Sequence, residues 1–93
     1  MSDYFAFLDR YDPAQIAALL EMEKAQTVAV VLGCLSPEKS AAVLKKLSPE
    51  LLNDVTKRLA TSGKVPENII AVMEGTLRKK LKNVSPSEKP GLG

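Results

Sequence analysis

Residues 35–59 read LSPEKSAAVLKKLSPELLNDVTKRL, a segment that repeats itself with an offset of 12 residues. Each copy opens with Leu-Ser-Pro-Glu and carries a valine, a lysine and a leucine at the same later positions. Proline at the first helical position gives up only an amide that has no partner within the helix, and the serine before it can accept from the amides that follow. The segment therefore predicts two short helices that start alike and turn the same side chains inward, as in a superhelical stack.

Two further helix starts of this kind flank the repeat. Asp12-Pro13 is followed by Gln15 at the spacing of a capping box, and Val65-Pro66-Glu67 precedes another apolar periodic run. The apolar spacing between the starts predicts an all-α fold of about five short helices. We place these helices at residues 13–22, 23–33, 37–46, 49–61 and 66–83.

The two ends of the chain differ in composition from the helical domain expected at residues 13–83. Residues 1–12 hold every aromatic side chain of the protein, and we expect this aromatic lead-in to dock on the helices because aromatic rings bury large apolar areas. Residues 84–93 are rich in serine, proline and glycine, which is typical of a flexible linker or tail.

The inward positions of successive helices predict a shared hydrophobic core. Its expected members are Val31, Leu32, Val55, Leu59, Ile70, Met73 and Leu77. The last helix is the longest, and we expect its C-terminal turns to reach past its shorter neighbours. Those turns then offer Met73, Leu77 and Leu81 as an apolar surface for stacking or self-association, so that the chain could form a homodimer.

Length and composition exclude several classes of function. A chain of 93 residues has room for one small domain, and its single cysteine cannot form an internal disulfide. Because the chain contains no histidine, it lacks the usual ligands of a transition metal and the usual proton relay of an enzyme. We therefore assign no catalytic residue, no metal ligand and no cofactor.

The charge and hydropathy patterns bear on location and partners. No apolar run is long enough to cross a bilayer and no signal stretch is present, so we expect a cytoplasmic protein without membrane insertion. Residues 1–23 are mainly acidic and residues 76–93 mainly basic, which favours head-to-tail contact or an acidic partner. The basic run Arg78–Lys82 has no interleaved aromatics, so we interpret it as a solvated helix end and not as a nucleic-acid site.

Eight stretches, taken in order, carry a family resemblance. They are FAFL (5–8), DPAQI (12–16), EKAQTVA (23–29), LSPEKSA (35–41), LSPEL (47–51), RLAT (58–61), VPE (65–67) and LRKKL (77–81). Together they resemble the middle domain of the bacterial flagellar motor-switch protein FliG, over residues 5 to about 83. The resemblance implies an armadillo-like, right-handed superhelix that works without catalysis as a scaffold of the rotor C-ring, on the cytoplasmic face of the inner membrane at the flagellar basal body.

The resemblance also implies partners. In that family the domain binds the switch protein FliM, largely through a Glu-His-Pro-Gln-Arg/Thr motif at the start of the second helix, and stacks on neighbouring FliG subunits during torque transmission and switching. Glu23, Gln26 and Thr27 match this motif, whereas Lys24 and Ala25 stand where the family has His-Pro. These five residues are the implied partner-binding site. The loss of proline removes a stiff helix start, and lysine changes the polar surface.

Two alternative functions remain open, and the resemblance covers only one domain of FliG. The regulatory helical-array domain of magnesium transporters shares the Asp-Pro-Ala and Ser-Pro-Glu helix starts but senses its cation through converging carboxylates, and here only Asp3, Asp9 and Asp12 come near to a cluster. A related flagellar chaperone is the other alternative. Nothing in the chain matches the FliG C-terminal domain with its torque-generating charges, so we expect an excised middle domain.

Overall fold

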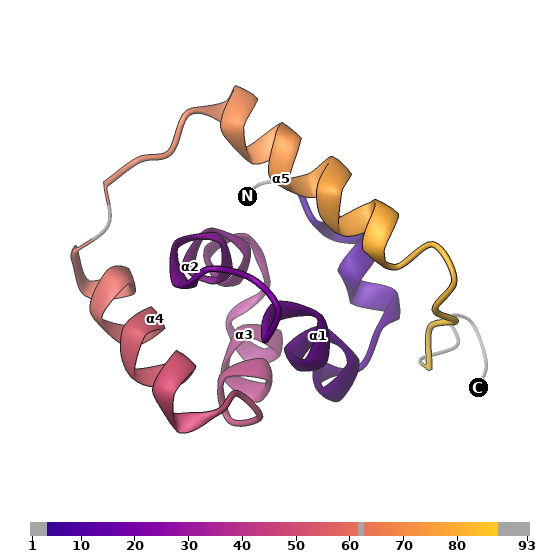
Figure 1. The fold of residues 1–93 in the computed structure, drawn as a ribbon, viewed down its shortest axis with the longest axis horizontal. Helices are drawn as coiled ribbons and strands as arrows, with labels where there is room; N and C mark the ends of the chain where they lie inside the picture. The colour runs from indigo at the N-terminus through magenta and orange to yellow at the C-terminus, as the bar shows by residue number, and fades with distance from the viewer. Residues whose placement is uncertain (1–3, 62, 88–93) are drawn as a thin grey trace.

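The computed structural model describes residues 4–61 and 63–87, and within them it contains helices and no strand. A short 3-10 helix, η1, is followed by five α-helices (Figure 1). Their bounds are η1 Ala6–Arg10, α1 Pro13–Leu20, α2 Ala25–Cys34, α3 Pro37–Leu44, α4 Pro49–Thr61 and α5 Glu67–Lys80. The all-α fold of five short helices predicted from the sequence is confirmed.

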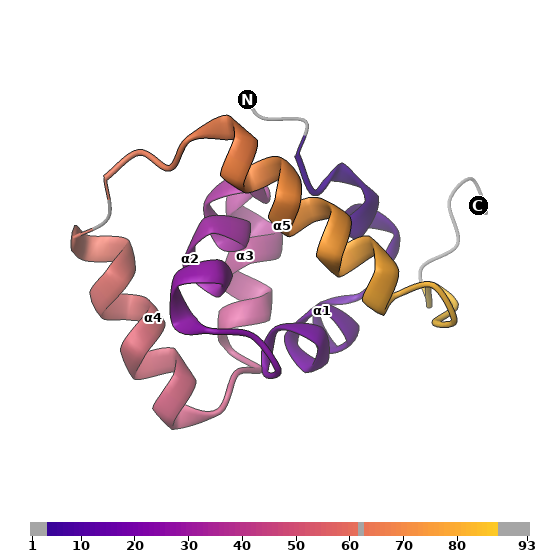
Figure 2. The ribbon, with the colours of Figure 1, turned by 45° about the horizontal axis from the view of Figure 1, so that its top comes forward.

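Helices two apart in the sequence pack on each other, and α2 lies in the middle of the fold. α1 packs on α3, and α2 packs on α4. Figures 1 and 2 show α4 on one side of α2 and α5 with η1 on the other, so that α2 lies in the middle of the fold. This position explains why α2 is apolar most of the way round, and its Val28 and Val31 are fully buried. Packing between alternate helices is compatible with an armadillo-like superhelix.

The helix starts form as their sequences predict. The backbone amide of Gln15 donates to the Asp12 carboxylate at 2.8 Å, and the Asp12 amide donates back to the Gln15 side chain at 3.2 Å, which completes the capping box of α1. Ser36 caps α3 by accepting from the amide of Lys39 at 3.2 Å. Ser48 opens the second copy of the repeat and accepts from the amide of Leu51 at 3.4 Å at the start of α4.

The two copies of the repeat are equivalent in their middle and differ at their end. Val43 and Val55 occupy the same place in each copy and both are fully buried. Leu47 is 7% exposed, but its counterpart Leu59 is 39% exposed. The prediction that Leu59 is a core residue is therefore wrong. No third copy of the repeat follows Leu59, and residues 63–66, just before α5, have no regular secondary structure.

The aromatic lead-in docks on the helices, as predicted, and its contacts lie mainly on α5. Phe5 and Leu8 are fully buried, and the guanidinium of Arg78 lies 4.5 Å from the centre of the Phe7 ring, a cation–π contact. Phe5 adopts a left-handed φ of 66°, an unfavourable conformation for a bulky residue. Its amide donates to the Glu74 carboxylate at 2.9 Å, and this bond together with the burial of the ring holds the strained backbone in place.

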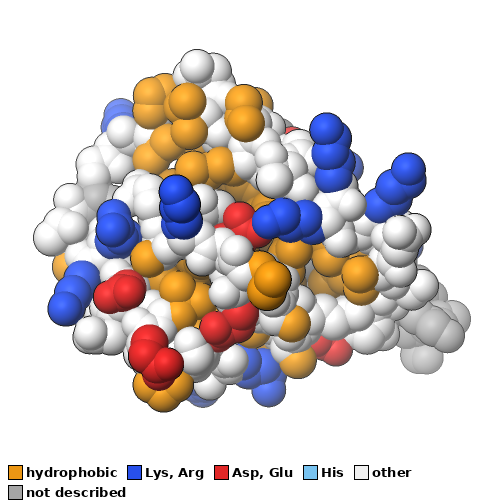
Figure 3. Space-filling view, in the orientation of Figure 1, with side chains coloured by type: hydrophobic (Ala, Val, Ile, Leu, Met, Phe, Trp, Pro, Cys, Tyr) orange, Lys and Arg blue, Asp and Glu red, His pale blue; other side chains and the backbone are white. Residues whose placement is uncertain are grey.

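The predicted core position of Leu77 on α5 is confirmed, but the exposed end of this helix differs from the prediction. Leu77 is fully buried and Leu81 is 7% exposed, because the lead-in packs on the C-terminal half of the helix. The expectation that these two leucines project beyond the fold is wrong. Ile69 and Val72, near the start of the helix, are 42% and 67% exposed. Figure 3 shows hydrophobic side chains gathered over the first turns of α5, at the top of the view.

Residues 84–87 cross the start of α1, and we call them the C-terminal strap. The Tyr11 hydroxyl donates to the carbonyl of Val84 at 3.3 Å, and the Gln15 side-chain amide donates to the carbonyl of Ser85 at 2.9 Å. The Ser87 hydroxyl donates to the Asp12 carboxylate. Residues 84–87 of the predicted tail thus contact the start of α1, while residues 88–93 lie outside the described residues. The flexibility of the tail stays a prediction.

Candidate partner-binding surface

The start of α2 differs from the starts of α1, α3 and α4 because no side chain caps it. Lys24 occupies the N-cap position in an extended conformation, and its side chain makes no capping hydrogen bond. Its carbonyl accepts the first helical bond, from Val28 at 3.1 Å. The first amides of a helix have no partner within the helix, so this start can donate hydrogen bonds to another molecule.

The five residues of the predicted site have different surroundings. Glu23 is engaged within the chain, because its carboxylate forms an ion pair with the ammonium group of Lys80 on α5. Ala25 packs against the hydrophobic core. Lys24 is exposed, whereas Gln26 and Thr27 are half-buried. The polar surface that a partner can meet therefore consists of Lys24, Gln26 and Thr27.

Arg58 joins this surface from α4, and no sequence motif predicted this. Its guanidinium Nη1 donates to Gln26 Oε1 at 3.2 Å, so an exposed cation from the end of α4 lies beside the start of α2. In sequence the two residues are 32 positions apart. The packing of α2 on α4 brings them together.

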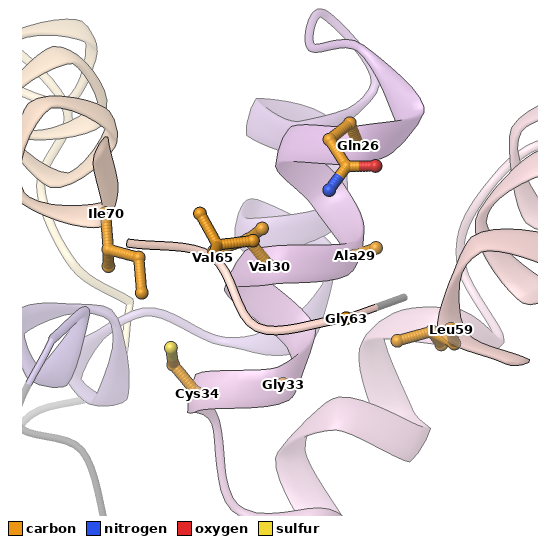
Figure 4. Close-up of a pocket in the computed structure, with 9 residues that line it drawn as sticks. All are labelled: Gln26, Ala29, Val30, Gly33, Cys34, Leu59, Gly63, Val65 and Ile70. Atoms are coloured by element: carbon orange, nitrogen blue, oxygen red, sulfur yellow. The ribbon is translucent and has the colours of Figure 1, made fainter. Parts of the chain in front are cut away.

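An apolar cavity of about 210 Å³ opens directly beside Gln26 (Figure 4). It lies between α2, the end of α4 and the connection that leads to α5. Its lining residues are Gln26, Ala29, Val30, Gly33, Cys34, Leu59, Gly63, Val65 and Ile70. Figure 4 shows Ile70 and Leu59 approaching α2 from opposite sides. Cys34 is half-buried and forms part of this wall.

Sequence reasoning missed this cavity, although one signal pointed to it. The near-repeat ends at Leu59, and no further Leu-Ser-Pro-Glu unit follows to cover that leucine. An incomplete stack leaves an apolar face without a neighbour. Leu59, the last residue of the repeat, forms one part of the cavity wall.

The stacking residues and the basic run are largely engaged within the chain. Leu77 and Leu81 belong to the core, and Met73 is half-buried against it. In the basic run, Arg78 lies over Phe7 and Lys80 pairs with Glu23. The exposed apolar surface of α5 consists instead of Ile69 and Val72.

The acidic residues weighed for cation binding do not gather. Asp12 serves as the helix cap, and hydrogen bonds from the Ser87 hydroxyl and then the Gln15 amide lower the pKa of its carboxyl below 3.8. Asp3 lies outside the described residues. Among residues 4–61 and 63–87, no three cysteine or carboxylate side chains are grouped so that they could hold a metal ion. Within the same ranges, no helix has the length and apolar character needed to cross a bilayer.

Comparison with known proteins identifies the family. The family model described as the FliG middle domain matches residues 13–88, from the first residue of α1 to just beyond the strap. The chain belongs to the FliG middle-domain family. The resemblance found in the sequence is thereby confirmed.

One FliG relative gives the scale of the match. The flagellar motor switch protein FliG of Thermotoga maritima is 36% identical to this chain over 77 residues, which are 83% of the chain and 23% of the relative. The chain thus spans less than a quarter of that protein's length. The candidate surface at Lys24, Gln26 and Thr27 lies inside the region that the FliG family model matches.

Proposed function

We propose that this FliG middle domain is a non-enzymatic scaffold of the flagellar motor switch, which binds a FliM-like switch protein at the start of α2. The single observation that carries the proposal is the family match over all five α-helices. The relative from Thermotoga maritima is named a flagellar motor switch protein, and its assembly is the setting we propose for this chain. That setting is the cytoplasmic face of the flagellar basal body, where the domain takes part in torque transmission and the switching of rotation.

The proposed docking edge consists of Lys24, Gln26 and Thr27. Two structural features support it: the start of α2 has no capping side chain, and the Gln26 carboxamide is half-exposed beside it. Polar side chains around open amides can form several hydrogen bonds with one partner segment. Glu23 contributes indirectly, because its ion pair with Lys80 ties the residue before the helix to α5.

We place the contact with neighbouring FliG subunits on the first turns of α5. Ile69 and Val72 are exposed there, and Met73 adjoins them at the edge of the core. Adjacent exposed apolar side chains are typical of an interaction surface. This surface replaces Leu77 and Leu81, which are buried within the chain.

The docking edge is tested by isothermal titration of the purified chain with the FliM-like switch protein of the same organism. Gln26→Ala and Thr27→Ala are expected to weaken binding, and Lys45→Ala serves as a control because Lys45 is an exposed residue at the end of α3. No binding by the wild-type chain would refute the proposed function. Equal binding by all four proteins would refute the site.

A further inference from the structure

The apolar cavity beside Gln26 is open to solvent and large enough to hold one side chain. Its volume of about 210 Å³ exceeds the roughly 150 Å³ of an engineered cavity that binds benzene. Leu59 and Ile70 flank α2, and the Cys34 thiol forms part of the wall. A bulky aliphatic or aromatic side chain that enters this space would remove these apolar surfaces from water.

The charged residues adjacent in sequence to the lining residues, which we call the rim, favour an acidic occupant. Arg58 immediately precedes the lining residue Leu59, and Lys64 stands between the lining residues Gly63 and Val65. Both basic side chains are exposed, and Arg58 is already oriented by Gln26. Glu67 is the exposed carboxylate nearest in sequence to this rim, so the balance of these three charges is positive.

We infer that the cavity receives one bulky apolar side chain from an acidic segment of the partner, whose flanking carboxylates pair with Arg58 and Lys64. The inference rests on the proposed function for the identity of the partner. It adds the chemistry of the segment that binds: an apolar anchor between acidic residues. The start of α2 and the cavity form one continuous surface, because Gln26 belongs to both. One partner segment can therefore dock at the first amides of α2 and anchor in the cavity.

A glycine in the wall allows the cavity to be filled without disturbing the fold. A Cβ atom added at Gly33 meets nothing within 4 Å, and Gly33 lines the cavity, so Gly33→Leu is the variant chosen to reduce the open space. Leucine also has the higher helix propensity, and the stability of the variant should be equal or greater. Gly75→Leu is the matched control, because Gly75 is also helical and unobstructed but does not line the cavity.

The first experiment measures binding of the FliM-like switch protein to these two variants. An anchor side chain that fills a buried pocket typically accounts for about a thirtyfold difference in affinity, so we expect a loss of that order for Gly33→Leu and none for Gly75→Leu. Equal affinities for the two variants and the wild type would overturn the inference. The proposed function would still stand in that case, since the wild type binds.

The rim is tested by charge reversal. Arg58→Glu and Lys64→Glu should each weaken binding and reduce its dependence on salt concentration, because exposed charge pairs are screened by salt. Lys45→Glu changes the net charge of the chain equally at a place away from the cavity and should leave binding unchanged. Equal effects of all three reversals would show a general charge effect and overturn the role of the rim.

Cys34 supplies a direct measure of occupancy, because it is the only cysteine of the chain and lines the cavity. Bound partner should slow the reaction of its thiol with N-ethylmaleimide in the wild type and in Gly75→Leu. An unchanged reaction rate at saturating partner concentration would overturn the inference.

A synthetic peptide makes the test independent of the proposed partner. The probe is an acetylated peptide with one phenylalanine flanked on each side by two glutamates. In nuclear magnetic resonance titrations we expect shifts at Ala29, Val30, Leu59 and Ile70, and their loss in Gly33→Leu. Absent shifts, or shifts spread over the surface, would overturn the inference even if the FliM-like protein binds.

Discussion

The guanidinium of Arg58 donates to the side-chain oxygen of Gln26 at 3.2 Å and so links the end of α4 to the start of α2. One residue of this pair belongs to the predicted partner site and the other does not. Their hydrogen bond fixes the orientation of the Gln26 carboxamide at the mouth of the apolar cavity. The proposed binding surface is therefore assembled from two helices, although the sequence motif lies on one.

This pair should behave as a unit in binding. Arg58→Ala and Gln26→Ala are each expected to weaken binding of the FliM-like protein, and the double variant should lose less than the sum of the two losses. Each substitution should lower the free energy of unfolding by less than about 1 kcal/mol, because Arg58 is exposed and Gln26 is only half-buried. Calorimetric titration and urea unfolding measure the two effects. Additive losses in affinity would show that Arg58 does not act through Gln26.

The two copies of the repeat provide a matched pair for core stability. Leu47→Ala removes a side chain that is 7% exposed, so it should cost about 2–5 kcal/mol. Leu59→Ala removes its 39% exposed counterpart and should cost less than about 1.5 kcal/mol. Urea unfolding of both variants makes the comparison. Equal costs would mean that Leu59 is covered in solution, for example by a second molecule.

The C-terminal strap makes the stability of the chain depend on pH at low pH values. Hydrogen bonds from Ser87 and Gln15 lower the pKa of Asp12 below 3.8, so the folded state favours the ionised form. The resulting stabilisation is complete above the ordinary pKa and is lost as the pH falls through the lowered value. As the pH is lowered, the free energy of unfolding of Asp12→Asn should therefore fall less steeply than that of the wild type. Ser87→Ala should do the same, and Asp54→Asn is the control, because Asp54 is exposed on α4.

Self-association should depend on the first turns of α5. Light scattering over a concentration series is expected to detect a dimer, and Val72→Lys should abolish it without changing the melting temperature, since Val72 is 67% exposed. Leu77→Lys should instead unfold the chain, because it introduces a charge at a fully buried position. A wild-type chain that stays monomeric at high micromolar concentration would contradict this prediction.

The sequence predicted the local features of the fold well because they depend on short-range chemistry. Proline fixes the first turn of a helix, and Ser36 and Ser48 then cap α3 and α4 over a span of three residues. Val43 and Val55 were correctly placed inward, because helical periodicity decides which face of each short helix is apolar.

The errors concern contacts between distant parts of the chain. An amphipathic stripe shows which face of α5 is buried but not which end is covered, and that choice depends on the lead-in, whose Phe5 amide binds Glu74 across 69 residues. The tail composition likewise gave no sign that Ser87 binds Asp12. The candidate site was half predicted: the motif named Gln26, but Arg58 and the cavity arise from the packing of α4.

The strap has a mechanical consequence for any chain that continues beyond Ser87. Because Ser85 and Ser87 are hydrogen-bonded to side chains at the start of α1, a pull from downstream is carried first by these bonds. The load then enters the domain at its first α-helix and not along the axis of its last one. The final turns of α5 can unwind only after the strap has detached, so these few hydrogen bonds set the tension at which the end of the domain begins to yield.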